Sequence, residues 1–216
     1  MSKVFIGVGH GGLDSGAIGL NGIYEKDINL AIALSARKEL ERHGVQVLMS
    51  RYKDENDSLK DEIKECNAYK PDLAIDFHNN AGGGDGFEAF RSVYGGKSTI
   101  LAKNIEAEVM AIGQNSRGVK TKLQNDGRDW FGFVRQTNCP AVLCEFAFVD
   151  TKDVEIVDTP QEQKAMGIAA AKGILKTLGI KWIAPKIDYS YIWVGKFTSK
   201  AAADKASKEI TGLGYY

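Results

Sequence analysis

The chain has 216 residues, of which 44% are hydrophobic and 26% are charged, values that are ordinary for a globular protein. Its 28 basic residues balance its 28 acidic ones, so no excess charge draws the whole protein to nucleic acid or to a membrane surface. No stretch approaches the roughly 18 apolar residues of a membrane-spanning helix, and the N-terminus lacks the apolar core of a signal peptide, so we expect synthesis in the cytoplasm without membrane insertion.

Strand and helix patterns alternate along most of the chain. Five segments are predicted as strands: KVFIGVG (3–9), VQVLMS (45–50), DLAIDF (72–77), FEAFRSV (87–93) and AVLCEFAFV (141–149). The spacing of apolar residues predicts helices over 26–44, 58–69, 98–113 and 160–179. The segment 117–137 is predicted as a loop with a short strand near its end. This alternation indicates an α/β fold with a mostly parallel or mixed twisted sheet and helices on both faces.

A boundary is predicted at WIAPKID (182–188), after which the pattern offers only one strand and one helix. We expect one domain over 1–180, a linker over 181–188 and a short β–α tail over 189–216. Some 30 residues cannot bury a core alone. The tail therefore packs on the main domain, pairs with a second copy as a dimerisation segment, or is part of a truncated module.

Two of the three histidines follow predicted strands, His10 after VFIGVG and His78 after DLAIDF. Ligands of open α/β sheets lie at the carboxyl ends of strands, and two imidazoles at one edge suggest a transition metal, with zinc expected first. The third ligand would be a carboxylate or a thiolate. Glu25, at the start of the first long helix, is a candidate; its alternative role is to complement the helix dipole. His43 lies in the last turn of that helix, where a positively charged side chain interacts favourably with the helix dipole.

Glu145 interrupts an otherwise apolar strand, where an unpartnered carboxylate is costly. Beside a metal-bound water it would serve as a general base; the alternative is a structural carboxylate paired with Arg or Lys. The three cysteines lack CxxC spacing and suggest reduced thiols, with Cys144 buried and inert. The glycines around His10 would leave a metal face uncrowded, whereas VGHGGLDSG matches neither phosphate-loop pattern.

The order of these pieces resembles the zinc-dependent N-acetylmuramoyl-L-alanine amidases of the amidase-3 family, which occur in bacterial autolysins and phage endolysins. HGGLDSGAIG (10–19) is similar to the family's HxGxxxxGAxG pattern, offset by one residue, and DFHNNA is similar to its SIHxNA segment. GIYEKDINLA, RGVK (117–120) and FGFVRQTNCPAVLCEFAFVDTKD complete a resemblance over about residues 3–178. Three departures stand out: Asp76 replaces a frequent Ser, Ala147 a frequent Gly, and Glu62 falls near a frequent Arg.

By that resemblance, His10, Glu25 and His78 would bind Zn²⁺, and Glu145 would be the catalytic acid/base. The expected reaction is hydrolysis of the amide between N-acetylmuramic acid and the L-alanine of the stem peptide. A zinc peptidase that cuts within the stem peptide and a non-catalytic wall-binding module are the alternatives. The candidates for substrate contact, with Asn80 taken from the SIHxNA-like segment and the other three from composition alone, are Asn80, Arg128, Trp130 and Phe131.

The resemblance makes bacterial peptidoglycan the expected partner. The tail YIWVGKFTSKAAADKASKEITGLGYY is similar to the first half of a SPOR-type wall-binding repeat. The expected localisation is the cell wall after release, and a phage endolysin is favoured over a secreted autolysin.

Overall fold

The computed structural model describes residues 1–185 and 199–212. The chain divides into two compact units, residues 1–182 and 183–216, and the second contains helix α6 (Lys200–Gly212). The strand predicted in the tail lies outside the described residues. Among the described helices, none combines the length and the apolarity that crossing a membrane requires.

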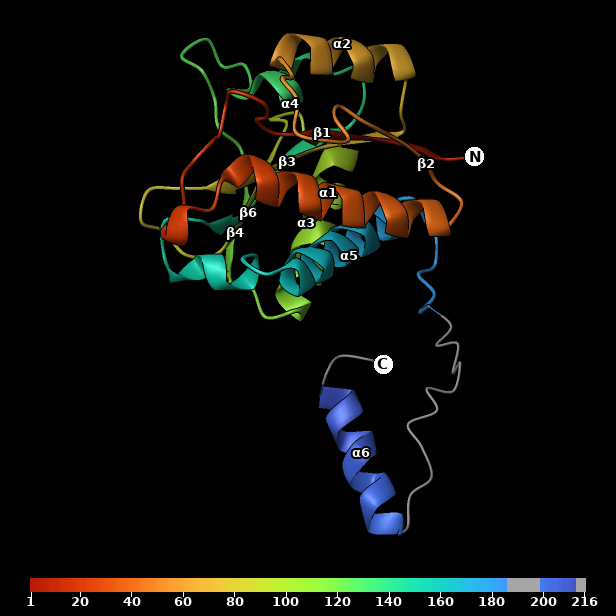
Figure 1. The fold of residues 1–216 in the computed structure, drawn as a ribbon. Helices are drawn as coiled ribbons and strands as arrows, with labels where there is room; N and C mark the ends of the chain where they lie inside the picture. The colour runs from red at the N-terminus through yellow and green to blue at the C-terminus, as the bar shows by residue number, and fades with distance from the viewer. Residues whose placement is uncertain (186–198, 213–216) are drawn as a thin grey trace. The chain divides into compact units, whose positions relative to one another are not determined.

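The first unit is built on a six-stranded mixed sheet (Figure 1). Its strands are β1 (Lys3–Val8), β2 (Gln46–Met49), β3 (Leu73–Asn80), β4 (Phe87–Arg91), β5 (Ser116–Lys120) and β6 (Ala141–Phe148), in the order β2-β1-β3-β6-β4-β5. β4 runs antiparallel to β6, and every other pairing is parallel. The predicted α/β class with a mixed sheet is therefore confirmed.

Helices cover both faces of this sheet (Figure 1). One face carries α1 (Glu25–Arg42), α3 (Lys97–Ala111) and α5 (Pro160–Thr177), and the other carries α2 (Leu59–Tyr69) and α4 (Gly132–Gln136). Two short 3₁₀ turns, η1 (Leu20–Gly22) and η2 (Lys152–Ile156), complete the unit. The alternation of β1 explains the two cores: Val4 and Ile6 face the larger core, while Phe5 faces the smaller one under α2.

The prediction for 117–137 was wrong at both ends. The strand β5 lies at the start of this segment, and its end forms the short helix α4. β5 is an edge strand that pairs only with β4, so it needs no continuous apolar run. The five residues of α4 are too few to display a helical repeat in the sequence.

The cysteines and the helix ends follow the sequence expectations. All three cysteines are free; Cys66 and Cys144 are buried, and burial raises the pKa of the Cys144 thiol well above its usual value. Ser58 caps α2 by accepting a hydrogen bond from the backbone N–H of Asp61. Gly44 follows α1 with a φ of 75°, the left-handed conformation expected of a residue that ends a helix.

Candidate metal centre

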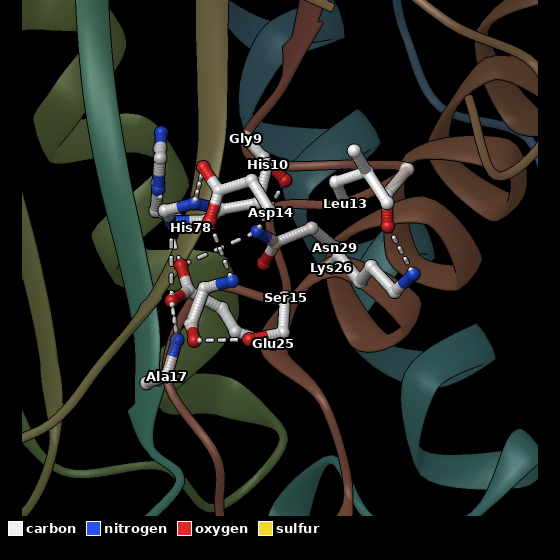
Figure 2. A network of polar contacts seen from close by, with 12 residues as sticks. Gly9, His10, Leu13, Asp14, Ser15, Ala17, Glu25, Lys26, Asn29 and His78 are labelled. Atoms are coloured by element: carbon white, nitrogen blue, oxygen red, sulfur yellow. Dashed lines mark hydrogen bonds and ion pairs between the residues drawn. The ribbon is translucent and has the colours of Figure 1, made fainter. Parts of the chain in front are cut away.

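The carboxyl ends of β1 and β3 are neighbours, and both predicted histidines lie there (Figure 2). His10 follows β1, His78 lies near the end of β3, and Glu25 is the first residue of α1. One potential ligand atom from each of these three side chains lies within 4.8 Å of the other two. The structure thus brings together the three residues that the sequence suggested, from three separate elements.

Glu25 lies between the two imidazoles. Its Oε2 is 3.3 Å from Nε2 of His10, and its Oε1 is 3.1 Å from Nδ1 of His78. The carboxylate is only 4% exposed, and it also accepts hydrogen bonds from the backbone N–H groups of Ala17 and Asn79, at 2.9 and 3.0 Å. A helix-start glutamate that only complemented the dipole would not be held at both oxygens by two other elements.

The three groups favour a bound cation. Burial opposes ionisation of Glu25, but the hydrogen bonds from His10 and His78 outweigh it and hold the pKa of this carboxyl far below its usual range. The hydrogen bond to Glu25 raises the pKa of His10. Burial opposes charge on His78 as well, yet Asp76 and Glu25 raise its pKa well above the usual value. Protons on the imidazoles occupy the position that a metal ion would take, because binding a metal requires these ligands to be deprotonated.

The backbone around His10 is shaped for this cluster. His10 has a φ of 65°, a left-handed conformation that is uncommon for a residue with a side chain. A Cβ at Gly9 would lie 2.1 Å from Cε1 of His78, so only glycine leaves room for that ring. The glycine-rich segment therefore allows the ring of His78 to lie close to the backbone next to His10.

Further polar residues form hydrogen bonds with the cluster, and the sequence alone did not indicate them. Asp14 Oδ2 lies 2.8 Å from Nδ1 of His10. The Asn29 carboxamide donates to the carbonyl of Gly9 at 3.0 Å and to Glu25 at 3.3 Å, and it accepts from Asn79 at 2.8 Å. The spacing of Asn29 in the sequence could have indicated its role, since a polar residue four positions after Glu25 lies on the same face of the helix.

Glu145 is paired with His78 in the register of β3 and β6. Its Oε2 is buried and has no hydrogen-bond partner, and across residues 1–185 and 199–212 no lysine or arginine forms an ion pair with this carboxylate. Among the described residues, Glu145 therefore does not form the structural ion pair that was its alternative role. Burial raises the pKa of Glu145 to about 7, while His78 opposes this effect.

A cleft of about 300 Å³ opens over this edge of the sheet. Its lining combines carboxylates with apolar side chains, and it contains His10, Asp14, Asp57, Leu59, Glu62, Asp76, His78, Phe131, Phe133, Leu143 and Glu145. None of the lining residues is a lysine or an arginine. A divalent cation in the histidine–glutamate cluster would offset part of this negative charge.

The structure places only one of the four candidates for substrate contact in the cleft. Phe131 lines the cleft. Trp130 is 52% exposed outside it, and Arg128 forms an ion pair with Asp126 at 2.6 Å. The side chain of Asn80 accepts a hydrogen bond from the backbone N–H of Ala81. Only Phe131 of the four therefore belongs to the cleft around the metal cluster.

The fold and this cluster define an α/β protein with a candidate metal centre beside a buried, unpartnered carboxylate. Residues 4–176 match the family model described as N-acetylmuramoyl-L-alanine amidase, and the chain belongs to this amidase-3 family. The predicted family resemblance is confirmed.

Two of the following three similar proteins are described as N-acetylmuramoyl-L-alanine amidases, and the third as an endolysin. The chain is 34% identical to a sporulation-specific N-acetylmuramoyl-L-alanine amidase of Bacillus subtilis, covering 100% of this chain and 83% of that one. It is 35% identical to the endolysin of Bacillus phage SPP1, covering 84% and 68%. The solved catalytic domain of the amidase CwlV from Bacillus (Paenibacillus) polymyxa var. colistinus matches with a TM-score of 0.74 and 29% identity, covering 84% of this chain and 100% of that domain.

Proposed function

We propose that the protein is a zinc-dependent N-acetylmuramoyl-L-alanine amidase that hydrolyses the amide between N-acetylmuramic acid and the L-alanine of the stem peptide. Membership of the amidase family supports the reaction class. The observation that carries the proposal is the arrangement at one sheet edge: the three ligand atoms of His10, Glu25 and His78 lie within 4.8 Å of one another, next to the unpartnered oxygen of Glu145.

The residues present fit zinc. Two imidazole nitrogens and one carboxylate oxygen form a donor set that catalytic zinc uses, with a further position left for water or substrate. The buried carboxylate at the centre and the acidic cleft both favour a divalent cation. When bound there, zinc would lower the pKa of a water molecule and polarise the scissile carbonyl.

Glu145 is the proposed general acid/base. Its unpartnered oxygen accepts a proton from the attacking water, and the new C–O bond forms as this proton is taken up. The C–N bond then breaks, and Glu145 returns the proton to the departing amine of L-alanine. A pKa near 7 suits both steps, since the group can take up and release a proton near neutral pH.

The remaining site residues hold this arrangement or contact the substrate. Asp14 and Asn29 keep His10 and Glu25 in position through the hydrogen bonds described above. Phe131 offers an apolar surface in the cleft for the stem peptide. Arg128 and Trp130, on the same loop but outside the cleft, would contact a longer stretch of the wall polymer, and Asn80 would act through the backbone that follows β3.

Peptidoglycan is the proposed partner, and the cell wall is the proposed place of action. The named relatives include a sporulation amidase and a phage endolysin, so release as a phage endolysin stays a prediction. The domain scheme also stays a proposal, with the catalytic domain over 1–180, the linker over 181–188 and the tail over 189–216. The wall-binding and dimer roles of that tail remain predictions.

Digestion of purified Gram-positive walls tests the proposal. New N-terminal L-alanine without new reducing sugar is the expected result. New termini deeper in the peptide would replace the amidase with an endopeptidase on the same metal cluster. No new terminus from zinc-loaded protein would leave a wall-binding module as the better description.

A further inference from the structure

Two buried carboxyl groups in the cleft have no part in the mechanism above. Asp76 is 2% exposed and Glu62 is 6% exposed, and both line the cleft. Oδ1 of Asp76 and Oε1 of Glu62 have no hydrogen-bond partner. Two acidic side chains at such depth need a reason, because burial of an unpartnered carboxylate is costly.

Asp76 contacts the second histidine of the metal cluster. It precedes His78 by two residues in β3, so both side chains point to the same face of the sheet. Oδ2 of Asp76 lies 3.4 Å from Nε2 of His78, while Nδ1 of the same ring faces Glu25 at 3.1 Å. The two ring nitrogens of His78 thus face different carboxylates: Nδ1 faces Glu25 in the metal cluster, and Nε2 faces Asp76 outside it.

The side chains of Glu62 and Asp76 come close together over the Cα of Gly7. A Cβ on Gly7 would lie 2.1 Å from Oε1 of Glu62 and 2.7 Å from Oδ1 of Asp76, so both oxygens converge on the space that this glycine leaves free. Two carboxyl groups so placed cannot both be charged at low cost. Burial and the neighbouring Asp76 raise the pKa of Glu62 well above its usual value, which favours an uncharged Glu62 packed beside Asp76.

We propose that Asp76 is a positioning residue that accepts the Nε2 proton of His78 and so keeps Nδ1 directed at the metal, and that Glu62 holds Asp76 in place. Metal-binding histidines commonly donate their second N–H to a carboxylate, which fixes the tautomer and the ring orientation. The pair also accounts for two departures from the family pattern, since Asp76 replaces a frequent Ser and Glu62 falls near a frequent Arg. This inference rests on the proposed zinc-dependent function.

Zinc affinity tests the role of Asp76. In the full chain, competition between zinc and a chromophoric chelator measures the Kd of the wild type, Asp76→Ala and Asp76→Asn. Asp76→Ala is expected to raise the Kd by roughly 10- to 100-fold. Asp76→Asn keeps an oxygen that can accept the Nε2 proton, so it should retain most of the affinity. Unchanged affinity in Asp76→Ala overturns the inference.

The tautomer of His78 gives a readout that general destabilisation would not move. In zinc-loaded, ¹⁵N-labelled protein, long-range ¹H–¹⁵N correlations should show the proton of His78 on Nε2, exchanging slowly with water. In Asp76→Ala this proton should exchange fast, whereas Asp76→Asn should preserve it. A wild-type His78 with its proton on Nδ1 contradicts the proposal, and this result does not depend on whether Asp76→Ala folds.

Conservative replacement tests Glu62. Glu62→Gln keeps an uncharged side chain of the same size beside Asp76 and should keep zinc affinity near that of the wild type, whereas Glu62→Ala should weaken it, by less than Asp76→Ala does. Glu39→Gln is the matched control, because Glu39 is also buried, at 7% exposure, but lies near the other end of α1. Its zinc affinity should equal that of the wild type. Equal affinity for Glu62→Ala and the wild type overturns the role of Glu62.

The same measurements separate this inference from the function on which it rests. A wild-type protein that binds no zinc removes both the proposed function and the positioning role. Stoichiometric zinc in the wild type, together with full affinity in Asp76→Ala, removes only the positioning role.

Discussion

His78 and Glu145 are directly paired residues of the adjacent parallel strands β3 and β6. The register of the sheet therefore fixes the separation between a proposed metal ligand and the proposed acid/base, and no loop movement is needed to bring them together. Most residues of both strands are buried, His78 and Glu145 are partly exposed toward the cleft, and the register shifts just beyond this pair, between His78 and Asn80.

The first prediction concerns proton transfer by Glu145. Glu145→Gln should lower kcat by about 10²- to 10⁴-fold, because the amide cannot accept a proton from water. Zinc content should remain near one ion per chain, since Glu145 is outside the proposed ligand set. Release of N-terminal L-alanine and zinc analysis of the same sample measure both effects. Near-normal turnover in Glu145→Gln would show that another group carries the proton.

The second prediction concerns the metal ligands. Saturating zinc should stabilise the metal-free wild type by about 4 kcal/mol at a free concentration 1,000 times the Kd. For a domain of this size that corresponds to a rise in Tm of roughly 10 °C. His78→Ala should lose both the hydrolytic activity and this zinc-dependent rise, measured by calorimetry. His43→Ala is the control, because its ring lies at the end of α1 and bonds the carbonyl of Glu39, so its rise in Tm should persist. An unchanged rise in His78→Ala would exclude it as a ligand.

The third prediction concerns the space at Gly9. Gly9→Ala would place a Cβ 2.1 Å from Cε1 of His78, so the ring must leave its position and zinc affinity should fall by at least about 10-fold. Gly44→Ala is a matched substitution with no atom within 4 Å of the new Cβ. It should cost about 1 kcal/mol through its positive φ and leave zinc binding unchanged. Equal zinc affinity in both variants would contradict the crowding argument.

The sequence predicted the metal cluster for a simple physical reason. The carboxyl ends of parallel strands meet at one edge, so His10 and His78 had to lie near each other once their strands were recognised. The contact between Glu62 and Asp76 could not be predicted in this way. It depends on how α2 packs over β1 and on the space above Gly7, and neither leaves a periodic signal in the sequence. The same holds for β5 and α4, where an edge position and a five-residue length removed the usual patterns.

The fourth prediction concerns the pH dependence of stability in the metal-free protein. The pKa of Glu145 is about 7 in the fold, against an ordinary value of 4.5, so the folded state binds this proton more tightly than the unfolded state. Its contribution to stability is therefore fully present below about pH 4.5 and is lost as the pH rises through 7. Glu145→Gln has no such proton to lose. Its stability relative to the wild type should increase between pH 4.5 and pH 8 by at most about 3 kcal/mol.

Denaturant unfolding of both metal-free proteins at several pH values measures this difference. Titrating groups far from residue 145 behave alike in the two chains, so their effects cancel in the comparison. The charge of Glu145 also raises the pKa of His78, so the titration of this neighbour is part of the measured difference. A difference that stays constant from pH 4.5 to pH 8 would show that the carboxyl of Glu145 is ionised in the fold at a normal pKa.

The fifth prediction concerns the end of the first unit. Trp182 packs against the larger core, its indole N–H donates to the buried Glu39, and Lys172 Nζ lies 4.2 Å from the centre of its ring. A chain that ends at residue 182 should therefore keep the Tm of the full-length protein. A chain that ends at residue 179 loses both contacts and should be less stable by about 2 kcal/mol.

Calorimetry of the two truncated chains, with Trp182→Ala in the full chain as the comparison, checks this boundary. Trp182→Ala should reproduce part of the loss seen on ending the chain at 179, because that truncation also removes Ile180, which packs against the larger core and donates a backbone hydrogen bond to Leu175. Both truncated chains should still bind zinc, since the proposed ligands lie between residues 10 and 78. If the chain that ends at 182 unfolds while the full chain is stable, the tail contributes to the first unit and the proposed domain scheme is wrong.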